Sequence, residues 1–425
     1  MTFGVILLWA YVSLEANMYF TYRRSLKKCE TRLRTSSYPP PDVSDNVMKQ
    51  LQVMPRIRTF YRDLFGASDH TEIKYGNIEN LFVHTIGATS QAVVKYMIKL
   101  AEKQLNHKFE KGYNNALQHT YCKEDDVVRG RYIPALLTSS LISLKFVCDW
   151  YIGRQFNRVN KEHAVYWIFD KGLLSKAKRV LIFMCGIGIG PITYLNLVSQ
   201  FKDIYDVIIM VEIKWISFHI RADPVADSVL IEDIGLFVTE YLHKQKLGCY
   251  CLNPDKCDSC TFQDSSLKNQ SEQCNNYAHK VASIPCDVMM HSGGALYFRR
   301  LIEKIRFSNK ILIEPACFLG GSSTATLQLY SYKSRNPLFQ YPLIKNLPKL
   351  LDIAECVLQT DTPMDSAFLI LSQQDKLFNP VPCAHFMERF HPSVEIFFVE
   401  NSGHGDAVAL HHLMTAAIIK KKIGC

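Results

Sequence analysis

Three residues with the chemistry of a nucleophile, a base and an acid each follow a short apolar run. Ser292 lies in the turn sequence HSGG after one run, and Asp375 and His404 follow two later runs. A serine hydroxyl becomes a nucleophile when a histidine takes its proton and a carboxylate orients that histidine. The chain order Ser292, Asp375, His404 therefore predicts a catalytic triad for acyl transfer.

Each of these residues alone has an ordinary interpretation as a turn serine, a solvated loop acid or a loop histidine. Their common position after apolar runs, in the expected order, favours the triad. Asp365 is a weaker candidate for the acid. His411 and His412 fall inside the predicted last helix and are interpreted as structural or surface residues.

A glycine-rich loop, CGIGIGP at 185–191, follows another apolar run. Backbone N–H groups of such a loop stabilise the oxyanion of an acyl-transfer intermediate, together with the N–H of the residue after the nucleophile. We therefore expect the oxyanion hole to use Gly186 or Ile187 with Gly293. A dinucleotide-binding loop is the competing interpretation, but the third glycine is misplaced and no ribose-binding acid ends the next run.

The elements that must position these residues form a repeating pattern. Short runs rich in aliphatic residues alternate with longer mixed segments, which is typical of buried parallel strands in an α/β sheet. Open sheets of this class bind ligands at the carboxyl ends of their strands. The predicted strands are 179–184, 207–211, 286–290, 310–314, 367–372 and 394–399.

These motifs resemble proteins of the α/β-hydrolase fold, particularly their membrane-anchored branch in fungi, plants and protists. CGIGIGPITYLNLV (185–198) is similar to the HGIGIG-type loop and Tyr-rich helix of that branch. ILIEPACFL (311–319) is similar to its DPxCF segment, with Glu314 in place of Asp. The similarity extends to 64–82, 164–169 and the aromatic N-terminus. It implies a serine ester hydrolase that needs no cofactor.

Two departures from the family pattern lie beside the proposed oxyanion hole. Cys185 stands where the loop has His, and Met290 stands where Gly precedes the nucleophile. They motivate a second hypothesis, a catalytically silent protein of this fold that serves as a binding or scaffold module. A third is an acyltransferase that uses the same nucleophile with an alcohol acceptor.

The N-terminus predicts a membrane anchor. Residues 3–20 carry one charge, Glu15, and as a helix they would span about 27 Å at about 1.5 Å per residue. Basic residues at 23, 24, 27 and 28 would hold the downstream chain on the cytoplasmic side. A buried N-terminal helix is the alternative, since Glu15 and Asn17 interrupt the apolar stretch.

Composition agrees with a membrane as the anionic partner. The net charge is +9, but the basic residues are scattered, whereas a nucleic-acid-binding protein usually shows a dense basic stripe. Lys420, Lys421 and Lys422 near the C-terminus would assist binding to an anionic leaflet. We therefore expect membrane lipids, and no nucleic acid, among the partners.

The organisation predicted for the 425 residues has three parts. Residues 1–28 form the anchor and its basic flank, 29–170 a linker and a mainly helical region, and 171–425 the α/β-hydrolase domain. That domain carries a Cys-rich insertion near 245–285 and a lid near 320–366. The lid is rich in Leu, Tyr and Phe, which either line an apolar acyl channel or pack the lid on the sheet. With the membrane anchor, the first interpretation predicts a hydrophobic or lipid-like ester as substrate.

Five of the 14 cysteines crowd into the insertion. Cys249, Cys251, Cys257, Cys260 and Cys274 include one CxxC pair, and thiolates at such spacing coordinate structural zinc. The remaining spacing matches no zinc module, so flexible loop cysteines or a redox-sensitive pair are equally good interpretations. If the cluster binds a metal, we expect a structural zinc ion.

Overall fold

The computed structural model describes residues 58, 61–62, 65, 67–85, 91–117, 135–171, 179–217, 219, 227–244, 286–317 and 362–424. The predicted anchor at 1–28, the Cys-rich insertion with its five cysteines, and most of the predicted lid lie outside these residues. Within them, we find no helix with the length and apolar character needed to cross a bilayer.

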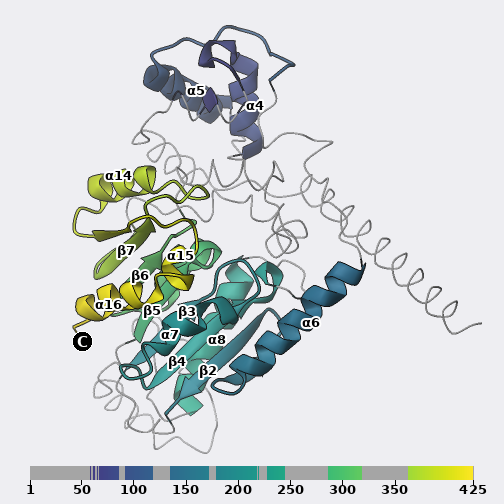
Figure 1. Ribbon diagram of the computed structural model, residues 1–425. Helices are drawn as coiled ribbons and strands as arrows, with labels where there is room; N and C mark the ends of the chain where they lie inside the picture. The colour runs from purple at the N-terminus through teal and green to yellow at the C-terminus, as the bar shows by residue number, and fades with distance from the viewer. Residues whose placement is uncertain are drawn as a thin grey trace, which may run out of the picture.

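The N-terminal part of the described chain is helical. Its elements are η1 (His70–Glu72), α4 (Tyr75–Thr85), α5 (Gln91–Leu105) and α6 (Ala135–Ile152). α4 packs on α5, and the buried Asn77 amide fixes the following chain by donating to the carbonyl oxygens of Asn114 and Leu117, each at 3.0 Å. Figure 1 shows α4 and α5 side by side, apart from the sheet.

Eight strands form one sheet in the order β1-β2-β4-β3-β5-β6-β7-β8 (Figure 1). From β4 to β8 all neighbouring strands are parallel. All six runs predicted as strands are strands of this sheet. The strands are β1 (Asn157–Asn160), β2 (Ala164–Asp170), β3 (Val180–Met184), β4 (Val207–Ile213), β5 (Cys286–His291), β6 (Lys310–Ile313), β7 (Ala367–Ser372) and β8 (Glu395–Val399).

The sheet begins earlier in the chain than residue 171, the predicted start of the α/β domain. β1 pairs antiparallel with β2, and β2 pairs antiparallel with β4. β1 is a short edge strand with the polar sequence NRVN, which carries no apolar run to reveal it. β2 is buried along its first five residues and extends the core.

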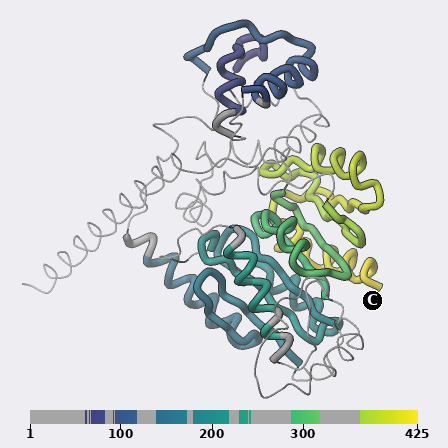
Figure 2. Tube along the Cα trace, turned by 180° about the vertical axis from the view of Figure 1, so that it is seen from behind, coloured from purple at the N-terminus to yellow at the C-terminus, as the bar shows by residue number. Residues whose placement is uncertain are grey.

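Helices cover both faces of the sheet, and the sheet is mainly parallel. The architecture is therefore of the expected α/β class. This agrees with the α/β-hydrolase fold. Figure 1 views the sheet from the side of α7 and α16, and Figure 2 from the opposite side. One face packs on α8 (Asp227–Lys244), α10 (Phe298–Lys304) and α14 (Pro380–Phe390), and the other on α6, α7 (Leu195–Ser199), α15 (Asp406–Ala409) and α16 (His412–Lys422).

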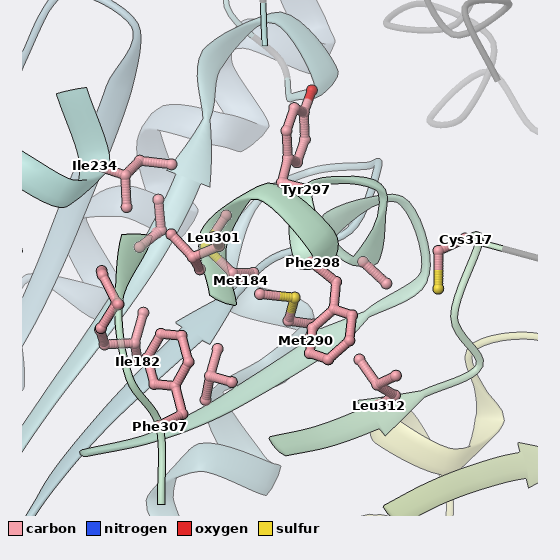
Figure 3. Packing of buried hydrophobic residues seen from close by; sticks show 14 of the residues in the cluster. Ile182, Met184, Ile234, Met290, Tyr297, Phe298, Leu301, Phe307, Leu312 and Cys317 are labelled. Atoms are coloured by element: carbon pink, nitrogen blue, oxygen red, sulfur yellow. The ribbon is translucent and has the colours of Figure 1, made fainter. Parts of the chain in front are cut away.

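Alternation along each strand divides the core into these two layers. In β3, Ile182 and Met184 face the α8–α10 side, whereas Leu181 and Phe183 face the α7–α16 side. Figure 3 shows the first layer, with Met290 of β5 among these apolar side chains. Every residue of β3 to β7 is buried, so these strands need no polar face.

The register of the parallel strands brings chemically active residues to one edge. His291 of β5 lies opposite Ile313 of β6, and Ile313 lies opposite Ile370 of β7. Ser372, at the end of β7, lies opposite Val399 of β8. The residues that follow these positions therefore meet at the carboxyl edge of the sheet.

Candidate active site

Ser292 lies on a sharp turn between β5 and the 3-10 helix η7 (Ser292–Tyr297). Its φ is +49°, in the left-handed region that side chains other than glycine rarely adopt. The turn requires Gly294, because a Cβ there would lie 2.6 Å from the carbonyl oxygen of Met184 and 2.8 Å from that of Cys185. The strained serine and the close approach together have the geometry of a nucleophile elbow.

The three residues predicted as a triad lie within hydrogen-bond distance in the predicted order. Ser292 Oγ is 2.8 Å from His404 Nε2, and His404 Nδ1 is 2.8 Å from Asp375 Oδ2. The other carboxylate oxygen of Asp375 accepts the backbone N–H groups of Leu377 and Phe378, each at 2.8 Å. These bonds orient Asp375, which in turn fixes the His404 ring.

The loop that carries His404 is held at both ends. Before it, the Ser402 hydroxyl donates to the carbonyl of Val399 at 2.5 Å. After it, Asp406 accepts the N–H of Gly403 at 2.6 Å, and Gly405 has a φ of +87° that suits glycine. The turn thus presents the imidazole toward Ser292.

Charges around His404 favour its protonated form. Burial acts to lower its pKa, but the Asp375 hydrogen bond and the negative charges of Glu314, Asp375 and Asp406 outweigh burial and raise the pKa above its ordinary value. The same field stabilises the imidazolium that forms when a base takes a proton from serine.

The three backbone groups predicted for the oxyanion hole have different partners. The Gly186 N–H donates to the Tyr194 hydroxyl at 2.9 Å and is therefore occupied. The N–H groups of Ile187 and Gly293 have no acceptor within the described part of the chain. Ile187 lies over Gly293, since a Cβ at Gly293 would be 2.7 Å from Ile187 Cγ1 and 3.5 Å from its N.

The two departures from the family pattern do not place side chains in the site. Met290 is fully buried in the layer shown in Figure 3, and Cys185 is fully buried in the opposite layer with Phe183 and Tyr194. Burial raises the pKa of the Cys185 thiol well above its ordinary value, so the thiol stays neutral. Both residues contribute to packing beneath the site.

The sequence marked Glu314 only as a departure from the DPxCF segment and predicted no role for it as a second polar group at this edge. Glu314 directly follows β6 and accepts a hydrogen bond from His291 at 2.9 Å, and His291 Nδ1 lies 3.0 Å from the Tyr194 hydroxyl. Glu314 follows a buried strand just as Asp375 does, so the rule that selected Asp375 also points to it.

The other polar candidates lie elsewhere. Asp365 precedes β7 and so lies at the opposite edge of the sheet, where its carbonyl oxygen accepts from Lys310 Nζ at 2.6 Å. His412 begins α16 and bonds the carbonyl of Ala409 at 3.1 Å, and His411 caps the same helix. Neither histidine contacts the triad in these bonds.

One described group of residues has the composition of a metal site. His291, Glu314 and His404 bring ligand atoms within 4.8 Å of one another. His291 and Glu314 bond each other, and His404 bonds Ser292 and Asp375, so these atoms are already used. We assign no metal ion to this group.

Comparisons with known proteins give structural neighbours but no close relative. No family model and no curated protein matches the sequence. Among solved structures, the chain is similar to a carboxylesterase from Bacillus subtilis, with a TM-score of 0.40, 10% identity and coverage of 67% of this chain and 97% of that one. An esterase from Pyrococcus furiosus has a TM-score of 0.41, 14% identity and coverage of 63% and 90%. A monoglyceride lipase from Saccharomyces cerevisiae has a TM-score of 0.39, 12% identity and coverage of 63% and 95%.

Proposed function

We propose that the protein is a serine ester hydrolase with Ser292 as nucleophile, His404 as base and Asp375 as the acid that orients it. The observation that carries this proposal is the pair of 2.8 Å contacts that joins the three side chains at the carboxyl edge of the sheet. The left-handed φ of Ser292 supports the same role, because a strained turn exposes the hydroxyl for attack.

The geometry supports a two-step reaction. His404 Nε2 takes the Ser292 proton as Oγ bonds to the ester carbonyl carbon, and the N–H groups of Ile187 and Gly293 stabilise the oxyanion. His404 then gives the proton to the departing alcohol as the C–O bond breaks, which leaves an acyl-enzyme. Water, activated by the same histidine, releases the acid and restores Ser292.

The silent-scaffold and acyltransferase alternatives use the same residues. The buried positions of Met290 and Cys185 favour an active enzyme, because the two departures that motivated a silent protein are absorbed by the core. An acyltransferase would differ only in replacing water by an alcohol in the second step. We retain hydrolysis as the proposal because the geometry requires no second acceptor site.

Turnover of p-nitrophenyl esters of increasing acyl length tests both reaction and substrate. We expect release of free acid in water, with kcat/KM higher for medium and long acyl chains than for acetate, because the predicted lid is rich in apolar residues. Acid release unaffected by added alcohol supports hydrolysis, whereas an acyl ester of that alcohol as the main product would indicate a transferase. Equal kcat/KM at all chain lengths would contradict the hydrophobic substrate.

We further propose that the protein associates with membranes, with the catalytic domain on the cytoplasmic side. The apolar stretch at 3–20 and its basic flank motivate this proposal, which is the feature shared with the membrane-anchored branch. A described surface supports it, namely the α6 apolar face, formed by Leu144, Phe146, Val147, Trp150 and Tyr151.

The α6 apolar face is a large apolar surface for one helix. Its five side chains are between 43% and 72% exposed. The opposite side of α6 is fixed to the sheet, where Lys145 Nζ lies 3.0 Å from a Glu212 carboxylate oxygen. Arg154 stacks 3.9 Å from the Trp150 ring centroid, which places a cation beside an aromatic ring, as at membrane interfaces.

Flotation with vesicles of phosphatidylcholine and phosphatidylserine tests this proposal. We expect the full chain to float and to remain bound at high salt, because apolar burial is not screened. F146S/W150S should lower vesicle affinity about tenfold through lost apolar burial, while the L410S control, at a side chain exposed like Phe146, should not. A chain that stays in the soluble fraction would contradict membrane association.

A further inference from the structure

Glu314 occupies a strained and fully buried position directly after β6. That strand lies between β5, which precedes Ser292, and β7, which precedes Asp375. Glu314 is 1% exposed, and its φ of +45° lies in the left-handed region. A non-glycine residue persists in this conformation only where its surroundings fix it, and such positions gather at functional sites. The bonds of its carboxylate show what fixes it.

The Glu314 carboxylate accepts hydrogen bonds from three elements that meet at the site. Oε2 accepts from His291 Nε2 at 2.9 Å and from the backbone N–H of Gly405 at 2.6 Å, while Oε1 accepts from the Ser372 hydroxyl. Gly405 directly follows His404, so Glu314 holds the backbone of the histidine loop. Oε2 also lies 3.7 Å from His404 Nδ1.

These bonds continue to the glycine-rich loop. The Gly186 N–H must donate to the Tyr194 oxygen, so the Tyr194 hydroxyl donates to His291 Nδ1, and the proton on His291 Nε2 is donated to Glu314. We call this series from Gly186 to Gly405 the buried hydrogen-bond chain. It joins the loop expected to stabilise the oxyanion to the loop that carries the base.

Glu314 is the charged group of the buried hydrogen-bond chain. Burial acts to raise the Glu314 pKa, but the hydrogen bond from His291, the neighbouring His404 imidazole and the hydrogen bond from Ser372 lower it to about 2. Burial lowers the pKa of His291, which therefore stays neutral despite Glu314. A carboxylate charge thus remains beside His404.

Among the residues that the structure describes, few other groups face His404. Asp375 bonds its Nδ1 at 2.8 Å, and Asp406 lies in its own loop. The neutral His291 ring stacks with its centroid 5.5 Å away, and the Phe378 ring packs edge-on at 5.0 Å. Glu314 and Asp375 are therefore two carboxylates that approach the imidazole from different strands.

We infer that Glu314 is a positioning residue for catalysis, which holds the His404 loop through Gly405 and places a second negative charge beside the imidazole. This inference rests on the proposed serine hydrolase. Its charge stabilises the imidazolium formed in each step, and its bond to Gly405 keeps Nε2 directed at Ser292. The proton itself moves only between Ser292, His404 and the leaving group.

Glu314→Gln removes the charge with little change in shape. An opposite charge at this separation shifts a pKa by about one unit or more, so the acidic limb of the kcat/KM profile should move to lower pH by about one unit. The limb moves to lower pH because His404 must be neutral to act as a base. Without the Glu314 charge, which favours the protonated imidazole, His404 stays neutral down to a lower pH. kcat on the plateau should fall about tenfold, the equivalent of one pKa unit, with KM nearly unchanged.

Two variants separate this role from general stability. Asp287→Asn alters another fully buried carboxylate, at the start of β5, which accepts from Tyr205 at 2.6 Å and pairs with Arg179. It should lower the melting temperature and leave the acidic limb in place. Glu314→Asp keeps the charge but shortens the reach to Gly405, so kcat should fall while the limb stays near its wild-type position.

An NMR titration of the His404 imidazole in the full chain gives a readout that needs no turnover. A lower His404 pKa in folded Glu314→Gln than in wild type supports the inference, and an unchanged pKa overturns it. If Glu314→Gln does not fold, an unchanged kcat in Glu314→Asp overturns the positioning role, and a lowered kcat with an unmoved limb supports it. A wild-type chain that turns over no ester would refute the proposed hydrolase, while the titration would still decide the effect of Glu314 on His404.

Discussion

Ser292→Ala is expected to lower kcat for a p-nitrophenyl ester by about 10⁶-fold, to a level set by the oxyanion donors and substrate binding alone. The reason is that, within the described part of the chain, Ser292 supplies the hydroxyl that approaches His404 Nε2, at 2.8 Å. The fold should survive, because alanine keeps the Cβ that this turn already accommodates. Steady-state kinetics with a melting curve measure both effects.

Ser308→Ala is the matched control for that substitution. Ser308 is exposed and precedes β6, at the edge of the sheet opposite Ser292. Its variant should turn over ester at the wild-type rate. A Ser292→Ala protein with more than about a hundredth of the wild-type kcat would show that another residue supplies the nucleophile, because loss of a nucleophile costs far more.

Asp375→Asn is expected to lower kcat by up to about 10⁴-fold. The amide keeps the shape of the carboxylate but has no charge. Its one oxygen stays with the N–H groups of Leu377 and Phe378, so an NH2 group replaces the acceptor Oδ2 that lies 2.8 Å from the protonated His404 Nδ1. Glu314 remains 3.7 Å from the same nitrogen, so residual turnover should exceed that of the Asp375→Asn/Glu314→Gln double variant. Kinetics of the two single variants and the double variant measure how far the effects of the two substitutions on kcat depart from additivity.

Asp365→Asn is the control for the choice of acid. Asp365 lies before β7, at the edge of the sheet away from the triad, so its variant should retain wild-type kcat. If Asp365→Asn lost turnover and Asp375→Asn kept it, the assignment of the acid would be wrong.

The parallel strands β3 to β7 were predictable because each is buried on both faces. A strand such as β3, VLIFM, has no polar face and leaves a continuous apolar run in the sequence. β1 and the extent of the sheet before residue 171 were not predictable in this way, because NRVN is polar and gains its strand conformation by pairing with β2.

The candidate triad was predictable because strand ends and chain order locate it. Ser292, Asp375 and His404 each follow a recognisable strand, and parallel strands end at one edge. The buried hydrogen-bond chain was not predictable, since it depends on register. His291 meets Glu314 only because β5 and β6 pair with His291 opposite Ile313.

The side-chain directions of Met290 and Cys185 also needed the structure. Both were interpreted from sequence as departures beside the oxyanion hole, where either would weaken catalysis. Alternation within β5 turns Met290 into the apolar layer, and Cys185 packs in the opposite one. Sequence position near a site therefore did not indicate a side chain in the site.

The most direct test of the proposed hydrolase is the position of a covalent adduct. A fluorophosphonate probe reacts with an activated serine and displaces fluoride, and peptide mass spectrometry then locates the modified residue. We predict one adduct per chain on Ser292, with labelling abolished in Ser292→Ala and strongly slowed in His404→Ala. A wild-type chain that remains unlabelled, or that carries the adduct on a different residue, would contradict the central claim that Ser292 is an activated nucleophile.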